Sequence, residues 1–397
     1  MTLPLTGVTV LAVEQYGAGP FGTMLLGDLG AEVIKIENPA GGGDMARAVG
    51  PHFLPDGSSQ FYHAFNRNKR SLTLNLKAPE GRDIFHRLVA EADAVLNNLR
   101  GDLPATLGLD YASLSKLNPA IVCAHLSAYG RDGPRRAWPG YDYLMQAEAG
   151  YLSLTGEPDA PPARFGLSVV DMMTGVTAAF ALTSGIVGAR ASGKGMDLDT
   201  SLFDTALHNL SYLATWRLNA GVNQGREPRS AHPSLVPSQL YRTADGWLFV
   251  MCNKEKFWPL LAEALDHPEW AADPRFATFA ARLEHRAEVT GMLDAALCER
   301  PTAAWLERLG GIVPVAPVND LAAALDNPFV ADRGRVAGYA GPDGTEMLRM
   351  LAGPVRVGGA EQPRTAGPEL GADTGAILRR LGLGETEIEA LRAKGVV

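Results

Sequence analysis

The first 130 residues alternate between strand-like and helix-like stretches, and this alternation constrains the fold more than any other feature of the sequence. Strand-like runs lie at 8–14, 31–37, 93–98 and 120–130, and helix-like stretches lie at 19–30 and 78–92. A strand, an amphipathic helix and another strand in succession are typical of parallel strands joined by crossover helices. The sequence therefore predicts an α/β fold with a parallel sheet.

The second half of the chain has a different pattern. Helices are predicted at 170–191 and 203–220, before a stretch rich in Gly, Pro, Ser and Asn at 220–239. After it the sequence predicts a hairpin at 240–252, helices at 254–265, 281–297 and 302–311, a strand pair around residues 343–344, and two short helices at 373–397. A chain of 397 residues exceeds what one core usually fills, so we expect two domains.

Charge and cysteine content narrow the class of protein. With 36 Lys and Arg against 44 Asp and Glu, the net charge is −8, which argues against binding nucleic acid by phosphate neutralisation. The three cysteines have no CxxC spacing and the first residues lack a signal-peptide pattern, so we expect a cytoplasmic protein. The longest apolar run, 176–189, is shorter than a bilayer span and is predicted to be a buried helix.

Three glycines near the N-terminus form a GxGxxG pattern between a strand and a helix. Gly17, Gly19 and Gly22 are followed by Glu37 at the spacing of a dinucleotide-binding fingerprint. However, polar residues separate the strand from Gly17, and Pro20 removes a backbone N–H beside the second glycine. We therefore favour a glycine-rich packing turn over a nicotinamide site, with a dehydrogenase as the other interpretation.

One carboxylate stands between two apolar stretches, in FGLSVVDMMTG at 165–175. Burying an ionised carboxylate without a partner costs several kcal/mol, so Asp171 is expected to be paired, to lie at a helix N-terminus, or to take part in chemistry. One interpretation is an N-cap to a helix that begins near Met172. The other is a catalytic acid, and the two are compatible.

Six stretches in this order carry a resemblance to a known family. They are AGPFGTMLLGDLGAEVIKIENPAGGGDMAR, NRNKRSLTLNLKAPEG, NNLRGDLPATLGLDY, SAYGRDGP, PGYDYLMQAEAG and DMMTGVTAAFALTSGIVGAR. The chain resembles the family III CoA-transferases, a group that includes formyl-CoA and carnitine CoA-transferases and α-methylacyl-CoA racemases. The likeness extends over nearly the whole chain.

The resemblance implies a domain arrangement. Residues 1–219 and 331–397 would form a large, Rossmann-like CoA-binding domain built from both chain ends. A linker at 220–239 would lead to a smaller inserted α+β domain at 240–330. Members of the family form homodimers whose two subunits interlock like links, and we expect the same here.

The resemblance also implies an active site. Asp171 matches the family's nucleophile, which attacks an acyl-CoA thioester and passes CoA to a second acid. CoA or acyl-CoA is the expected substrate, with no tightly bound cofactor and no metal. The residues expected to bind CoA are Gln15, Gly17, Ala18, Asn38, Leu74, Asn75, Leu76, Lys77, Asn98, Leu99, Arg100, Tyr141 and Asp142. Arg67, Lys69 and Arg70 form a basic cluster that either adds positive charge to this site or is a solvated loop.

Sequence details favour transfer over racemisation. Racemases of this superfamily carry a histidine in a GHD motif, whereas this chain has GYD at 140–142, and tyrosine is a poor base near neutral pH. His125, on a neighbouring strand, keeps an acyl-CoA racemase or epimerase as the alternative. A CoA-binding protein without turnover is a third interpretation. The formyl-CoA transferase pattern is incomplete, so we expect acids of the C4 or C5 dicarboxylate class, such as succinate or mesaconate.

Overall fold

The computed structural model describes residues 2–397, which divide into two compact units. The large unit comprises residues up to 149, 165–211 and 332–397, and the small unit comprises 150–164 and 212–331. The sequence analysis placed 150–164 and 212–219 with the large domain, but both segments pack within the small unit. Arg226 Nη1 donates to Ala160 O at 2.7 Å, and the backbone N–H of Arg229 donates to Glu157 Oε1 at 2.9 Å.

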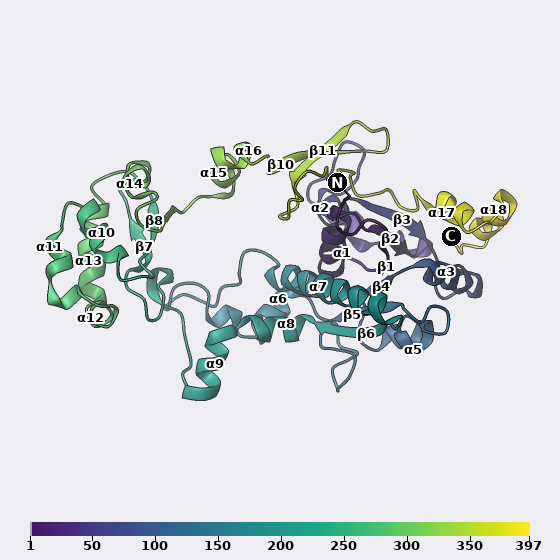
Figure 1. Ribbon diagram of the computed structural model, residues 1–397, viewed down its shortest axis with the longest axis horizontal. Helices are drawn as coiled ribbons and strands as arrows, with labels where there is room; N and C mark the ends of the chain where they lie inside the picture. The colour runs from purple at the N-terminus through teal and green to yellow at the C-terminus, as the bar shows by residue number, and fades with distance from the viewer. Residues whose placement is uncertain (1) are drawn as a thin grey trace. The chain divides into compact units, whose positions relative to one another are not determined.

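A six-stranded parallel sheet forms the centre of the large unit (Figure 1). Its strands are β1 (Thr9–Val13), β2 (Glu32–Glu37), β3 (Lys69–Thr73), β4 (Ala94–Asn97), β5 (Val122–Ser127) and β6 (Met196–Ser201). Their order is β3-β2-β1-β4-β5-β6, so the direction of winding reverses between β1 and β4. The predicted parallel sheet is confirmed, although the sequence analysis missed β3 and β6. Both are edge strands with many polar residues, which weakens the apolar signal.

Helices cover both faces of this sheet. The helices of the large unit are α1 (Ala18–Asp28), α2 (Gln60–Asn66), α3 (Pro79–Glu91), α4 (Leu103–Thr106), α5 (Tyr111–Leu114), α6 (Asp142–Glu148), α7 (Val169–Ser192), α8 (Leu202–Asn209), α17 (Thr374–Arg380) and α18 (Glu385–Ala393). On one face α7 packs on α1, β5 and β6. On the other face, residues of α3, α17 and α18 share one buried core with the sheet, and Figure 1 shows these three helices together.

Successive residues of β5 pack against helices on opposite faces of the sheet. Val122 approaches Gly185 of α7, where an added Cβ would lie 2.7 Å from a Val122 methyl group. The next residue, Cys123, belongs to the core under α3, α17 and α18. Because side chains alternate across a strand and both faces are covered, β5 is buried at every position.

The C-terminal part of the large unit begins with an antiparallel strand pair, β10 (Val336–Ala340) and β11 (Glu346–Leu351). This confirms the strand pair predicted around residues 343–344. Hydrogen bonds tie this region to the N-terminal part of the large unit: Gln362 Nε2 donates to Asp28 O at 3.0 Å, and the Thr365 backbone N–H donates to Asn68 Oδ1 at 2.9 Å. The two predicted terminal helices are α17 and α18.

The small unit combines a three-stranded antiparallel sheet with short helices. Its elements are β7 (Ser238–Arg242), β8 (Trp247–Met251), β9 (Val315–Pro317), α9 (Ser211–Ala220), α10 (Phe257–Ala264), α11 (Glu269–Ala272), α12 (Phe279–Glu284), α13 (Arg286–Leu297), α14 (Thr302–Leu309), α15 (Leu321–Leu325) and α16 (Pro328–Asp332), with the end residues Ser211 and Asp332 assigned to the large unit. The predicted hairpin is confirmed as β7 and β8. The helix predicted at 203–220 is two helices, because the backbone of Ser211 turns to a positive φ of 48°.

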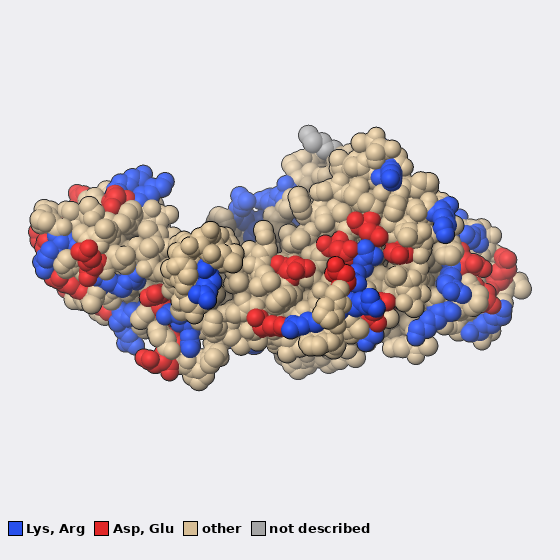
Figure 2. Space-filling view, turned by 90° about the horizontal axis from the view of Figure 1, so that it is seen from below, with Lys and Arg blue, Asp and Glu red and all other residues tan. Residues whose placement is uncertain are grey.

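Two surface features bear on the class of protein. On the face drawn in Figure 2, basic side chains lie interspersed with acidic ones, and no broad basic patch covers it. Helix α7 is long and apolar enough to cross a membrane by length and composition alone. It packs instead along α1 and the sheet, although Phe180 and Val187 remain 73% and 66% exposed.

Candidate active site

A pocket of about 350 Å³ lies at the carboxyl ends of the central strands of the large unit. It lies where the loops after β1 and β4 meet, which is the switch point of the sheet and the usual ligand position in open α/β folds. Paired hydrogen bonds join the two loops: the Gln15 backbone N–H donates to Asn98 Oδ1 at 2.9 Å, and Asn98 Nδ2 donates to Gln15 O at 2.7 Å. Eighteen residues line it: Gln15, Tyr16, Gly17, Ala18, Met45, Asn98, Leu99, Arg100, Leu103, Leu126, Ser127, Ala128, Trp138, Pro139, Gly140, Tyr141, Asp171 and Leu202.

Asp171 is the carboxylate in this pocket. It lies in the first turn of α7, which begins at Val169 after the N-cap position Ser168. The N-cap interpretation is therefore wrong, because the helix starts at Val169, three residues before the start near Met172 that this interpretation requires. A first-turn position still places the acid near the positive end of the helix dipole. Among residues 2–397 no hydrogen bond or ion pair to the Asp171 carboxylate is recorded, so its oxygens remain available to a ligand.

Burial raises the pKa of Asp171 to about 7, and the negative charge of Asp142 adds to the increase. The Asp171 backbone N–H donates to Asp142 Oδ2 at 2.9 Å, while Gln146 Nε2 donates to Asp142 Oδ1 at 2.5 Å. Asp142 is itself buried at the start of α6 and does not line the pocket. It lies behind Asp171, where it holds the first turn of α7 in place.

This pKa predicts how activity depends on pH. Only an ionised carboxylate is a nucleophile, and at pH 6 most of the free protein would carry Asp171 in its protonated form. If Asp171 is the nucleophile that the family resemblance implies, kcat/KM should rise about tenfold per pH unit below pH 7 and level off above it, because kcat/KM reports the free enzyme. A profile that stays flat between pH 5.5 and pH 8 would contradict a raised pKa at the reacting group.

The GxGxxG glycines are explained by close packing at this site. A Cβ added at Gly17 would lie 2.5 Å from Asp171 Oδ2, and one at Gly19 would lie 3.0 Å from the Asn98 side chain. A Cβ at Gly22 would lie 2.5 Å from the carbonyl oxygen of Gly175, where α1 and α7 cross. The packing-turn interpretation is therefore the one the structure supports, with each glycine admitting a different neighbour.

Eight of the fourteen residues proposed from the sequence line the pocket: Gln15, Gly17, Ala18, Asn98, Leu99, Arg100, Tyr141 and Asp171. Asn38, Leu74, Asn75, Leu76 and Lys77 follow β2 and β3, at the same carboxyl edge of the sheet but outside the pocket. Among these five, Asn38 caps a short turn by accepting from the Ala40 N–H, and Lys77 is exposed. The Leu74 side chain is buried in the core, so only its backbone can meet a ligand.

Sequence reasoning missed several lining residues, notably Tyr16, Met45, Ser127, Trp138 and Leu202. Tyr16 and Ser127 stand just after or at the end of a strand, a position that could have identified them. Met45 and Trp138 lie on connections whose path only the tertiary structure defines. The Trp138 ring, 52% exposed, is held by the Arg135 guanidinium 4.8 Å from its centre.

The proposed basic cluster is not part of a phosphate-binding surface. Lys69 is fully buried and forms an ion pair with Glu14 at 2.7 Å, and Arg67 is buried against Asp28. Arg70, which is partly exposed, pairs with Glu32 and Asp373. Neither the ligand-binding nor the solvated-loop interpretation of this cluster holds, because acidic partners from other segments neutralise all three side chains.

His125 does not supply a base to the pocket. Its ring is 1% exposed, with Nδ1 2.8 Å from Asn97 Nδ2 and Nε2 2.9 Å from Asp197 Oδ1. It does not line the pocket, although its neighbour Leu126 does. No observation in the structure therefore favours the racemase alternative. The residues described, 2–397, also contain no group of three or more His, Cys, Asp and Glu able to hold a metal ion.

The fold and the site together are those of an α/β protein with an acid of raised pKa at the switch point of a parallel sheet. A family model for CoA-transferase family III matches residues 5–374. A succinate–glutarate CoA-transferase from Agrobacterium fabrum is 36% identical, covering 86% of this chain and 86% of its own length. An acetyl-CoA:oxalate CoA-transferase from Acetobacter aceti is 34% identical, covering 95% of both chains.

Solved structures agree with the sequence relatives. The crystal structure of a CAIB/BAIF family protein from Brucella suis superposes with a TM-score of 0.81 at 34% identity, covering 96% of this chain and 100% of the other. The chain belongs to CoA-transferase family III, and it is an enzyme of that family. The resemblance stated from the sequence is thereby confirmed.

Proposed function

We propose that this enzyme moves CoA from an acyl-CoA to a carboxylic acid with Asp171 as the nucleophile. The observation that carries the proposal is an acid in the central pocket whose carboxylate has no hydrogen-bond or ion-pair partner among residues 2–397 and whose pKa is raised to about 7. Such a carboxylate ionises near neutral pH and keeps the nucleophilicity that a salt bridge would remove. No other carboxylate lines the pocket in the described part of the chain.

The proposed reaction has four balanced steps. Asp171 attacks the thioester carbonyl, which forms a mixed anhydride and releases the CoA thiolate. The thiolate attacks the aspartyl carbonyl of the anhydride, which forms an aspartyl-CoA thioester and releases the donor acid. The acceptor carboxylate then attacks that thioester to form a second anhydride and CoA thiolate. The thiolate finally attacks the acceptor acyl carbon, which gives the new acyl-CoA and restores Asp171.

The loops around the pocket supply a binding track for CoA in this proposal. The residues after β1 and β4, Gln15 to Ala18 and Asn98 to Arg100, line the pocket itself. Asn38 and the segment 74–77 lie farther along the same sheet edge, with Lys77 and Arg100 exposed and positively charged. We assign these two cations to the CoA phosphates, because they are the basic members of the proposed CoA-binding set. Tyr141, 56% exposed, lines the pocket near the thioester in this arrangement.

Trapping the acyl-enzyme tests the role of Asp171. Wild-type protein incubated with succinyl-CoA and then with hydroxylamine is expected to carry a hydroxamate at residue 171, detected by peptide mass spectrometry. Borohydride is expected to reduce the same thioester and leave a homoserine-type residue at this position. Labelling at any other carboxylate, or no labelling under turnover conditions, would refute the assignment.

We propose C4 or C5 dicarboxylates, such as succinate or mesaconate, as the acids exchanged. The name of the Agrobacterium relative, which includes succinate and glutarate, supports this size, while the Acetobacter relative is named for the C2 acid oxalate. Transfer from succinyl-CoA should therefore be faster to glutarate or mesaconate than to oxalate, formate or acetate. Equal rates across this panel would remove the size preference.

We further propose that the enzyme is a homodimer, interlocked as the family resemblance implies, and that it is cytoplasmic. An apolar groove of about 440 Å³ between α1, α7 and residues 353–355 supports a second subunit. Phe180 lines this groove while 73% exposed, and exposed apolar surface of this kind usually marks an interface. Light scattering that finds only monomer at micromolar concentration would contradict the dimer.

A further inference from the structure

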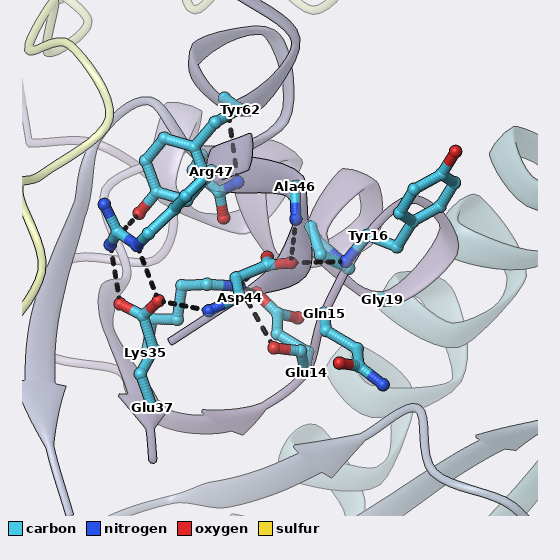
Figure 3. A network of polar contacts seen from close by, with 12 residues as sticks. Glu14, Gln15, Tyr16, Gly19, Lys35, Glu37, Asp44, Ala46, Arg47 and Tyr62 are labelled. Carbon is cyan, nitrogen blue, oxygen red and sulfur yellow. Dashed lines mark hydrogen bonds and ion pairs between the residues drawn. The ribbon is translucent and has the colours of Figure 1, made fainter. Parts of the chain in front are cut away.

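Four charged side chains are buried directly beneath the turn that follows β1, and three of them, Glu14, Lys35 and Asp44, are labelled in Figure 3. They are Glu14, Lys35, Asp44 and Lys69, all 5% exposed or less. Lys35 Nζ lies 2.8 Å from Asp44 Oδ2 and 3.8 Å from Glu14 Oε1, and Lys69 Nζ lies 2.7 Å from Glu14 Oε1. Burying four charges is expensive even when they are paired, so the arrangement needs a reason beyond stability.

The turn above these charges is strained. Tyr16 has a φ of 68°, in the left-handed region that a bulky side chain rarely adopts and that costs about 1–3 kcal/mol. Asp44 Oδ1 accepts a hydrogen bond from the Tyr16 backbone N–H at 2.9 Å. Lys35 Nζ donates to the carbonyl oxygen of Glu14 at 3.1 Å. The ion pair of Lys35 and Asp44 therefore holds the backbone on both sides of Gln15, as Figure 3 shows.

Further hydrogen bonds hold Asp44 itself in place. Its backbone N–H donates to Glu37 Oε1 at 2.9 Å, and Glu37 is paired with Arg47 at 2.7 Å. Asp44 Oδ1 also accepts from the Ala46 backbone N–H at 2.9 Å. The contacts form a continuous path from the end of β2 to the turn after β1, in which each charged group has a partner.

What this turn positions is Gly17. Gly17 follows Tyr16 directly, and its Cα lies against the Asp171 carboxylate: a Cβ added to Gly17 would lie 2.5 Å from Asp171 Oδ2. A shift of the turn by an ångström would therefore either press the backbone onto the Asp171 carboxylate or open a gap beside it. We propose that Asp44, through its ion pair with Lys35, is a positioning residue for CoA transfer. The inference rests on the proposed role of Asp171.

The substitution Asp44→Asn tests whether Asp44 positions the turn for the reaction or only stabilises the folded protein. Asn has one side-chain oxygen, and the buried Lys35 ammonium would attract it more strongly than a neutral N–H does. The amide NH₂ would then face the Tyr16 N–H, a donor against a donor, so the turn would lose its anchor. Asp44→Asn is expected to lower kcat about 100-fold and to change KM for the acyl-CoA less than threefold, because misplacement affects the reacting groups.

Asp28→Asn is the matched control in the same unit. Asp28 is also buried, and its carboxylate also pairs with one cation, Arg67, at 2.7 Å. It lies at the far end of α1 from Gly17 and has no recorded contact with the turn. We expect Asp28→Asn to lower the melting temperature as much as Asp44→Asn does, while kcat stays within threefold of wild type.

A second variant tests the same role if the first one does not fold. If Asp44→Asn does not fold, the double variant Lys35→Met with Asp44→Ala removes both charges together and leaves neither member of the pair uncompensated. It also removes the acceptor of the Tyr16 N–H, so the same loss of kcat is expected. The inference is overturned if the folded variant keeps kcat within threefold, or if Asp28→Asn loses kcat equally.

The labelling experiment distinguishes this inference from the proposed function. In Asp44→Asn the hydroxylamine label should still appear at Asp171, about 100-fold more slowly than in wild type. Rapid labelling of Asp171 in this variant would overturn the positioning role and leave the nucleophile in place. No label at Asp171 in the wild type would instead remove the proposed function itself.

Discussion

Replacing Asp171 by asparagine is expected to lower CoA transfer about 10⁴-fold or more, because an amide cannot form the acyl anhydride. Its size is nearly unchanged, so the pocket should keep its shape and acyl-CoA should still bind. Steady-state transfer assays, together with binding of CoA by calorimetry, would measure both effects. Transfer within tenfold of wild type would exclude Asp171 as the nucleophile.

The same substitution is expected to stabilise the protein at neutral pH. The folded pKa of about 7 lies above the ordinary value of 3.8, so the folded state binds the proton more tightly than the unfolded state does. Ionising Asp171 in the folded protein therefore lowers the free energy of unfolding of the wild type. This loss is absent below about pH 4, grows between pH 4 and pH 7, and is complete above pH 7. About three pKa units correspond to about 4 kcal/mol at most.

Thermal denaturation at pH 4 and pH 8 would measure this effect. Asp171→Asn should melt higher than wild type at pH 8 and within a few degrees of it at pH 4. Asp204→Asn is the control, since Asp204 also lies in the first turn of a helix, α8, but is exposed and does not line the pocket. It should neither stabilise the protein at pH 8 nor lower transfer more than about threefold. If the difference in melting temperature between Asp171→Asn and wild type were the same at pH 4 and pH 8, the raised pKa would be contradicted.

Gly17→Ala is expected to lower transfer about 100-fold while leaving the melting temperature nearly unchanged. The new methyl group would lie 2.5 Å from Asp171 Oδ2, so the carboxylate would have to rotate away from its present direction. The φ of Gly17 is −115°, which alanine also adopts, and the obstacle is the end of one flexible side chain. Misalignment of about an ångström at a reacting group typically costs this much in rate.

Gly188→Ala provides the comparison on the same helix as Asp171. A Cβ at Gly188 would meet only the Met196 methyl group, at 3.8 Å, so the substitution should keep full transfer and slightly favour the helix. If Gly17→Ala also kept full transfer, close approach at position 17 would not matter for the reaction. Loss of folding in Gly17→Ala would show instead that the Asp171 side chain cannot move.

Most of the fold followed from local pattern. Apolar strands such as β1 and β2 are buried on both faces, so their composition alone identified them. The sequence analysis did not predict the edge strands β3 and β6, because charged residues such as Lys69, Arg70 and Asp197 are typical of loops unless their partners are known. The ends of helices were similarly uncertain: α7 begins before Asp171, which changes that residue from a cap to a first-turn acid.

The sequence by itself determined the parallel α/β fold, the family, and Asp171 as the acid to examine, because strand and helix periodicity and an acid among apolar residues are local properties. Only the tertiary structure decided which residues surround that acid. Gly17, Asp142 and Asp171 are far apart in the chain: the packing of α1 on α7 brings Gly17 to Asp171, and the packing of α6 on α7 brings Asp142 to it. The buried pairing of Lys35 with Asp44 is likewise a product of folding, since a charge in sequence looks solvated until its partner is brought within 3 Å.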